Sequence, residues 1–129
     1  MRTAYEIIKA HYDASDRRDL AGMIADIAPD CRWIEMDGFP CAGTHVGPQE
    51  IVRNVFEALG KMFDGYSFAL ERLLDAGDDV VGIGDYRGIN KTTGKPFHAR
   101  VVHIWGVENG SIKRFEQFTD TLRVAQSMR

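Results

Sequence analysis

Strand patterns in the second half of the sequence limit the possible fold more than any other feature. After Gly65, apolar and polar residues alternate in four segments, near residues 66–75, 79–89, 96–107 and 111–119. Turn-forming sequences separate these segments, at residues 76–79, 90–95 and 108–111. Because connections this short join neighbouring strands, we predict an antiparallel meander.

The first half carries helical patterns instead. Between residues 3 and 15, apolar residues recur at helical spacing, which predicts an amphipathic helix. A second, short helix is expected over residues 20–28, with Asp19 as its N-cap and Pro29 ending it. The two helices are therefore expected to pack their apolar faces on the sheet.

One more strand and one more helix lie between these halves. Residues 31–37 alternate like a strand, and a Gly- and Pro-rich stretch without periodicity follows. Pro48 predicts the start of a third helix that reaches about Phe63. The predicted order is α-α-β-α-β-β-β-β, and the tail from Asp120 either adds a helical turn or frays. Three helices cannot cover both faces of the sheet, so part of one face is expected to meet a second subunit.

Length and charge narrow the class of protein. The 129 residues suit one domain, 1–129, with a real core. The 16 basic and 19 acidic residues are spread along the chain, so we expect no nucleic-acid partner. The N-terminus lacks the apolar core of a signal peptide, and no uncharged apolar run reaches about 18 residues. We therefore expect no membrane span and a cytoplasmic protein whose two cysteines stay reduced.

Three segments of the chain resemble the SnoaL-like, or ketosteroid-isomerase-like, superfamily, also called nuclear-transport-factor-like. They are DLAGMIADIAPDCRWIE (19–35), AGTHVGPQEI (42–51) and HIWGVENGSIKRFEQFTD (103–120). The resemblance implies an α+β cone: a strongly curved, mostly antiparallel sheet packed on three N-terminal helices and enclosing a small-molecule pocket. It also implies a homodimer joined through the sheet face. The fold hosts isomerases, cyclases, hydrolases, dehydratases and non-catalytic binders, so it leaves the activity open.

Glu35 is the first candidate catalytic residue. It alternates with Trp33 on one face of a short strand. A carboxylate beside an indole in a poorly solvated pocket has a raised pKa, which suits a general acid or base. The resemblance places Glu35 where the ketosteroid isomerases carry their carboxylate base. The alternative is a wet edge strand that leaves Glu35 an ordinary surface charge.

His103 is the second candidate. It shares an apolar strand face with Phe97 and Trp105, so we expect it to point inward, where an imidazole could polarise a carbonyl. The resemblance places it where the isomerases carry a buried acid of the oxyanion hole, and places His11 or Tyr12 at their tyrosine. A core histidine bonded to a backbone carbonyl is the alternative. A Glu and a His at these two isomerase positions argue against steroid isomerisation.

The sequence leaves the location and role of two charged residues open. Arg100 is expected on the opposite face from His103, at an interface or in solvent, but a β-bulge would turn it into the pocket. Asp120 follows the last strand, near the place where related epoxide hydrolases carry a water-activating carboxylate, and it could instead cap a helical turn. The pocket is predicted to be lined by Trp33, His11, Phe63, Tyr86, Phe97, Arg100, Trp105 and Phe118.

No metal or cofactor motif occurs. The four histidines form neither HxH nor HExxH, and GxGxxG, P-loop and GxSxG motifs are missing, so we expect no metal and no cofactor. The leading hypothesis is a cofactor-independent isomerase, cyclase, lyase or hydrolase that acts by general acid–base catalysis on a small apolar or cyclic carbonyl compound. Glu35, His103, Tyr12 and Asp120 are its candidate catalytic residues. The alternatives are a domain that binds a small ligand unchanged and an interaction domain whose cone is filled by its own side chains.

Overall fold

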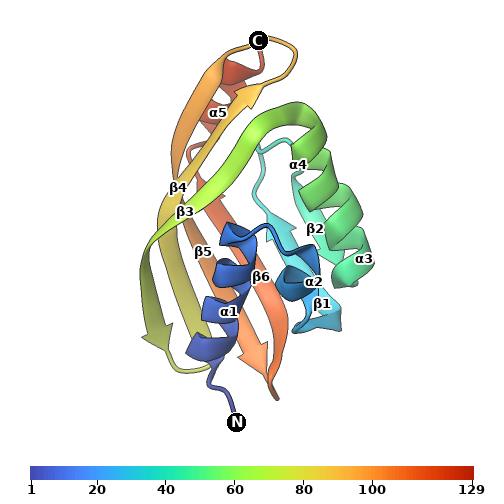
Figure 1. Ribbon diagram of the computed structural model, residues 1–129, viewed down its shortest axis with the longest axis vertical. Coiled ribbons are helices and arrows are strands. Elements are labelled where there is room, and N and C mark those ends of the chain that lie inside the picture. Colours follow the sequence, from blue (N-terminus) through green and yellow to red (C-terminus); the bar gives the residue numbers. More distant parts are fainter.

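Six strands form one curved sheet in a computed structural model that describes residues 1–129, and helices cover its inner face (Figure 1). The strand order across the sheet is β2-β1-β6-β5-β4-β3. Strands β3 to β6 form the predicted antiparallel meander, whereas β1 runs parallel to β6. The strands are β1 (Ile27–Glu35), β2 (Gly43–Val46), β3 (Phe63–Ala76), β4 (Asp79–Asn90), β5 (Pro96–Glu108) and β6 (Ser111–Thr119).

Local capping fixes where the first two helices begin. The Thr3 hydroxyl accepts from the Glu6 N–H, and the Glu6 carboxylate accepts from the Thr3 N–H, a reciprocal capping box. Asp19 accepts from the Gly22 N–H, as its predicted role as an N-cap requires. The helical segments are α1 (Ala4–Asp16), α2 (Leu20–Ile24), α3 (Gly47–Ile51), a π-helical turn η1 (Val52–Phe56), α4 (Glu57–Met62) and α5 (Thr121–Ser127).

The second predicted helix is too long by one turn. Helix α2 ends at Ile24, and the residues that follow enter β1 at Ile27. Pro29 therefore lies inside a strand, where the pairing of β1 with β6 is irregular between Ile27 and Arg32. An interrupted ladder tolerates the missing N–H of proline.

Two other segments differ from expectation. Part of the predicted loop forms β2, which pairs antiparallel with β1 and places His45 opposite Trp33. The third predicted helix is divided into α3, η1 and α4, because one turn makes i→i+5 rather than i→i+4 hydrogen bonds. The tail from Asp120 is helical, as α5.

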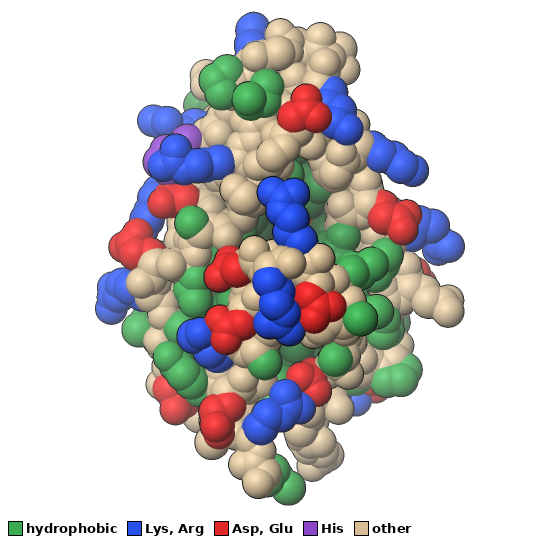
Figure 2. All heavy atoms as spheres, viewed as in Figure 1, with side chains coloured by type: hydrophobic (Ala, Val, Ile, Leu, Met, Phe, Trp, Pro, Cys, Tyr) green, Lys and Arg blue, Asp and Glu red, His purple; other side chains and the backbone are tan.

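The core lies between the helices and the inner face of the sheet. Strand β5 shows the predicted alternation: Ala99, His103 and Trp105 are buried, whereas Arg100 on the other face is exposed. Over the face shown in Figure 2, charged side chains of both signs are interspersed. No helix is both long and apolar enough to cross a membrane.

Candidate functional site

A mostly apolar cavity of about 170 Å³ lies between α1, the helical segment 47–62 and the inner face of the sheet. Seven of the residues singled out in the sequence line it: His11, Tyr12, Trp33, Glu35, Tyr86, His103 and Trp105. The other lining residues are Ser15, Met23, Val55, Phe56, Leu59, Tyr66, Ser67, Phe68 and Phe115.

Glu35 is buried at the cavity wall, with 3% of its surface exposed. Strand β1 is not an edge of the sheet, because β2 and β6 pair with its two sides. Oε1 accepts a hydrogen bond from the Cys41 thiol at an Sγ–Oε1 distance of 3.6 Å, whereas Oε2 has no partner. Burial raises the pKa of Glu35 to about 7, although contacts with Cys41 and Trp33 oppose the shift. The carboxyl group therefore changes charge near neutral pH.

Trp33 places a second unpartnered polar atom at the cavity. Its ring stacks on Phe115 with centroids 3.9 Å apart, and its Nε1–H is buried without an acceptor. This N–H lies near enough to Glu35 to lower the pKa of the carboxyl group, yet it reaches hydrogen-bonding geometry with neither oxygen.

His103 connects two tyrosines at the other polar part of the cavity. Its Nδ1 lies 2.8 Å from the Tyr12 hydroxyl, and its Nε2 lies 2.7 Å from the Tyr86 hydroxyl. Burial, assisted by repulsion from His11, lowers the pKa of His103 to about 3, so the imidazole is neutral at physiological pH. The ring is thus held by side chains, whereas His11 is the histidine that bonds a backbone carbonyl, that of Met23.

Each tyrosine oxygen also accepts a hydrogen bond from a group whose role as donor is fixed. The Trp105 Nε1–H donates to the Tyr12 oxygen at 2.8 Å, and an indole N–H is only a donor. The Gln117 Nε2 amide donates to the Tyr86 oxygen at 2.8 Å. The orientation of that amide is fixed, because its Oε1 accepts from the Met36 N–H at 3.4 Å.

Counting protons shows that this network leaves one donor unused. Two hydroxyl groups and a neutral imidazole carry three protons, but only two hydrogen bonds join them. If Nδ1 carries the ring proton, the Tyr12 O–H remains unused; if Nε2 carries it, the Tyr86 O–H makes no bond within this network and lies beside the Tyr66 hydroxyl. We call this group the free phenol. Both tyrosines line the cavity, so its O–H can donate to a bound molecule.

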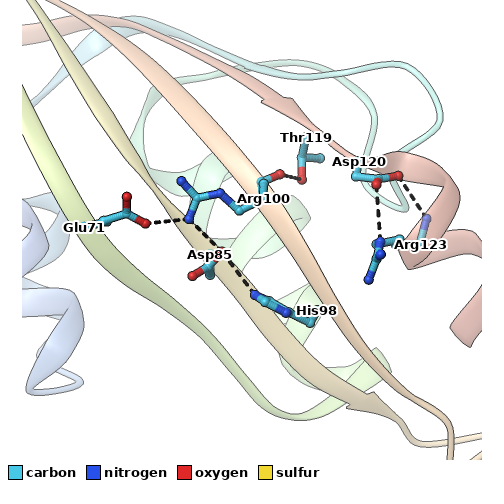
Figure 3. A network of polar contacts seen from close by, with 7 residues as sticks. All are labelled: Glu71, Asp85, His98, Arg100, Thr119, Asp120 and Arg123. Atoms are coloured by element: carbon cyan, nitrogen blue, oxygen red, sulfur yellow. Dashed lines mark hydrogen bonds and ion pairs between the residues drawn. The ribbon is translucent and has the colours of Figure 1, made fainter.

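The structure places three of the predicted residues away from the cavity. Arg100 lies on the outer face of the sheet, where it pairs with Glu71 at 2.6 Å and Asp85 at 3.1 Å (Figure 3), because no bulge reverses β5 there. Asp120 is exposed and caps α5 by accepting from the Arg123 N–H at 3.3 Å. Phe118 is also on the outer face and is 41% exposed.

Two predicted aromatic residues belong to the core beside the cavity. Phe63 and Phe97 are buried and pack edge to face, with ring centroids 5.1 Å apart, but neither lines the cavity. Phe97 lies on the inward strand face predicted for it, but too far along β5 from His103 to reach the cavity. Phe63, predicted at the end of a helix, is the first residue of β3.

Sequence reasoning missed several polar residues of the site: Ser15, Tyr66 and Ser67 line the cavity, and Gln117 and Cys41 bond to residues that line it. Gln117 shares a strand face with Phe115, so the alternation of residues 111–119 was a usable signal for it. Cys41 lies in a segment without periodicity, and nothing in the sequence indicated that it would approach Glu35. Both Cys31 and Cys41 are buried free thiols. No group of three or more His, Cys, Asp or Glu side chains is placed to hold a metal ion.

A curved sheet with helices closing a partly polar cavity defines the NTF2-like class of α+β cone proteins. The model of the SnoaL-like domain family matches residues 8–115. The chain belongs to the SnoaL-like family.

Solved structures support the same fold. An NTF2-like protein from Burkholderia thailandensis is 59% identical with a TM-score of 0.99, over 100% of this chain and 99% of that one. An NTF2-like protein of unknown function from Burkholderia pseudomallei is 28% identical with a TM-score of 0.88, over 98% of both chains. TerC, co-crystallised with polyporic acid, is 24% identical with a TM-score of 0.85, over 97% of both chains. None of the curated proteins compared matches the sequence significantly.

Proposed function

We propose that the protein is a cofactor-independent enzyme that moves a proton on a small, largely apolar carbonyl compound, as an isomerase, cyclase or hydratase would. The observation that carries the proposal is the unpartnered Oε2 of Glu35, a buried carboxyl oxygen at a cavity that also contains the free phenol. A base and a hydrogen-bond donor at one apolar cavity are what enolisation requires.

Glu35 acts as the base in this proposal. Its Oε2 takes a proton from the carbon next to the carbonyl group, and the same carboxyl group returns the proton to another position. A carboxyl pKa of about 7 suits both steps near neutral pH, because neither protonation state is strongly favoured. The Cys41 thiol occupies Oε1, which leaves Oε2 to meet the substrate.

The free phenol stabilises the oxyanion that develops on the carbonyl oxygen. The donors from Trp105 and Gln117 and the bonds to His103 hold both tyrosine oxygens in place before a substrate arrives. A donor that is already oriented costs no reorganisation in the transition state, so its hydrogen bond favours the enolate over the ketone.

The size of the cavity indicates a compact substrate. An engineered apolar cavity of about 150 Å³ binds benzene, and the cavity here measures about 170 Å³. We therefore propose a substrate with one ring. TerC, which shares the fold, was co-crystallised with a small organic molecule, polyporic acid, which supports small-molecule binding by a fold of this kind.

Proton exchange on simple ketones tests the function without knowledge of the natural substrate. Cyclohexanone in D₂O is followed by NMR, and 3-cyclohexen-1-one is followed by the absorbance of its conjugated isomer. We expect the wild type to accelerate both reactions and Glu35→Gln to lower the rate by about 10²–10⁴-fold. Glu71→Gln is the matched control, since Glu71 lies on the outer face with Arg100.

Two outcomes would count against this enzyme. Equal rates for the wild type and Glu35→Gln would exclude Glu35 as the base. A ligand that is recovered unaltered and that both proteins bind equally well would favour the alternative, a protein that binds a small molecule without transforming it.

We also propose that two copies of the chain pair through the outer face of the sheet. Strand pairing aligns Val81 with Ile104, and Val102 with both Ile83 and Phe118. These side chains are partly or largely exposed, although apolar surface of this kind is usually covered. We call the set the outer apolar strip: Leu74, Val81, Ile83, Val102, Ile104 and Phe118.

A further inference from the structure

The indole N–H of Trp33 and the Oε2 of Glu35 are the only buried side-chain polar atoms without a hydrogen-bond partner. Trp33 and Glu35 are two residues apart on β1, and therefore share the strand face that lines the cavity. One atom is a donor and the other an acceptor, and they lie near each other without bonding directly. Leaving such groups unpaired costs free energy, so a polar group that reaches both atoms from the cavity would supply the missing partner.

We infer that Trp33 and Glu35 together hold one hydroxyl oxygen of the ligand. This inference rests on the proposed function and names the substrate class of the same site. The hydroxyl oxygen accepts from the Trp33 N–H while its proton is donated to one lone pair of Glu35 Oε2, and the second lone pair of Oε2 remains for the proton of the substrate carbon. In the free protein a water molecule takes the same position, because a water has the same donor and acceptor groups.

Other polar groups fit this pair less well. A ketone oxygen accepts from Trp33 but has no proton for the carboxylate, and would lie against its negative charge. An ammonium group donates to Glu35 but leaves the indole N–H unpaired. Four aromatic rings, those of His11, Phe56, Trp105 and Phe115, surround Trp33, and none of them provides an acceptor for the indole N–H.

The rest of the cavity completes the description of the ligand. The free phenol supplies a donor near His103, which suits a carbonyl oxygen. The remaining lining is mostly apolar, and the volume suits one ring. The ligand is therefore a single-ring compound that carries a hydroxyl group at the Trp33 end and a carbonyl oxygen at the His103 end.

A pair of probes of matched shape tests the hydroxyl site. Phenol and toluene differ by a hydroxyl in place of a methyl group, and their dissociation constants are measured by calorimetry or NMR at pH 8 for the wild type and Trp33→Phe. We expect the substitution to weaken phenol relative to toluene by about tenfold, the effect of one hydrogen bond to a charged or buried partner. Phe56→Leu is the control, because it removes a ring that contacts Trp33 but removes no donor.

The ratio of the phenol and toluene dissociation constants distinguishes loss of the hydroxyl site from a general loss of packing in the cavity. A general loss of packing in Trp33→Phe weakens both probes and leaves the ratio unchanged, which would overturn the inference. A crystal structure of the free protein is expected to contain a water within hydrogen-bonding distance of Trp33 Nε1 and Glu35 Oε2. In the phenol complex, the phenol oxygen should replace it.

A water that stays in place while phenol binds elsewhere would also overturn the assignment to the ligand. None of these binding measurements depends on turnover. An unchanged phenol-to-toluene ratio together with a loss of proton exchange in Glu35→Gln would reject the hydroxyl site and leave the proposed function standing. A changed phenol-to-toluene ratio in Trp33→Phe together with unchanged proton exchange in Glu35→Gln would reject the function and retain the hydroxyl site.

Discussion

The hydroxyl group of Tyr12 occupies the space that a side chain at residue 82 would need. A Cβ placed on Gly82 would meet the Tyr12 oxygen more closely than real Cβ contacts allow. Gly82 lies on β4 directly opposite His103 on β5. The missing side chain therefore lets Tyr12 reach over one strand to the imidazole on the next.

Gly82→Ala is expected to displace Tyr12 and break its hydrogen bonds with His103 and Trp105. Overpacking of this kind costs about 1–3 kcal/mol of unfolding free energy, and ketone proton exchange should fall because the free phenol loses its orientation. Denaturant unfolding and the exchange assay measure the two effects. Gly60→Ala is the control, since Gly60 is helical and a Cβ there has open space; equal stability of the two variants would contradict the contact.

Burial of Glu35 makes stability depend on pH in a predictable direction. Its pKa is raised from 4.5 to about 7 in the folded protein, so between these values the folded state holds a proton that the unfolded state has released. Unfolding free energy is therefore lost as pH rises through 7, by about 3 kcal/mol for a shift of this size. The lowered pKa values of His11 and His103, about 4 and about 3, act in the opposite direction below pH 6.5.

Comparison with Glu35→Gln isolates the carboxyl group, because both histidines are present in both proteins. The variant should gain stability over the wild type as pH rises from 5 to 8, by about 3 kcal/mol in total. Unfolding in urea at several pH values measures the difference. Glu71→Gln should show no such trend, and a difference that stays constant with pH would show that Glu35 is not desolvated.

The thiol of Cys41 tunes the basicity of Glu35. It donates to Oε1, and this hydrogen bond lowers the carboxyl pKa against the larger effect of burial. Cys41→Ala should therefore move the lower limb of the pH–rate profile for ketone exchange to higher pH, whereas Cys41→Ser, which keeps a donor, should move it less. Cys31→Ala is the control for loss of a buried thiol. An unchanged midpoint in Cys41→Ala would remove Cys41 from the site.

The outer apolar strip predicts how the proposed dimer can be broken. A lysine in place of Ile104 or Phe118 would place charge in the interface, and a buried unpaired charge strongly disfavours association. Light scattering should then report the mass of one chain instead of two. Leu122→Lys serves as the control, since Leu122 is an exposed apolar residue on α5 outside the strip. A wild type that is already monomeric would reject the dimer.

Much of the site followed from strand alternation. Because side chains of a strand return to the same face at every second residue, Glu35 was placed with Trp33, and His103 with Trp105, on inward faces. All four side chains are buried as predicted. Alternation gives the face of a residue but not its position along a curved sheet, which is why Phe97 lies beside the cavity rather than in it. Phe118 was assigned inward because it is apolar, although alternation with Gln117 places it outside.

Contacts between distant segments could not be predicted in the same way. Whether His103 bonds a backbone carbonyl or two hydroxyl groups depends on how α1 crosses β4 and β5, which no local pattern encodes. The approach of Cys41 to Glu35 depends on the path of an irregular segment. Strand β2 forms within a stretch rich in Gly and Pro, where no strand was expected. Its pairing with β1 means that Glu35 does not lie on a solvent-exposed edge strand.

The π-helical turn η1 makes the cavity sensitive to the length of the chain at this point. A π-helical turn contains one residue more than an α-helix needs to span the same height, and each residue turns a helix by about 100°. The wider turn absorbs this extra residue, so deletion of one residue between Val52 and Phe56 would restore a regular helix and leave α3 and α4 facing as they do now. Leu59 would stay at the cavity wall, whereas the cavity-lining residues of the turn itself, Val55 and Phe56, would change direction. Gain or loss of a single codon in this turn thus offers lineages of the family a route to reshape the pocket without any substitution in the sheet.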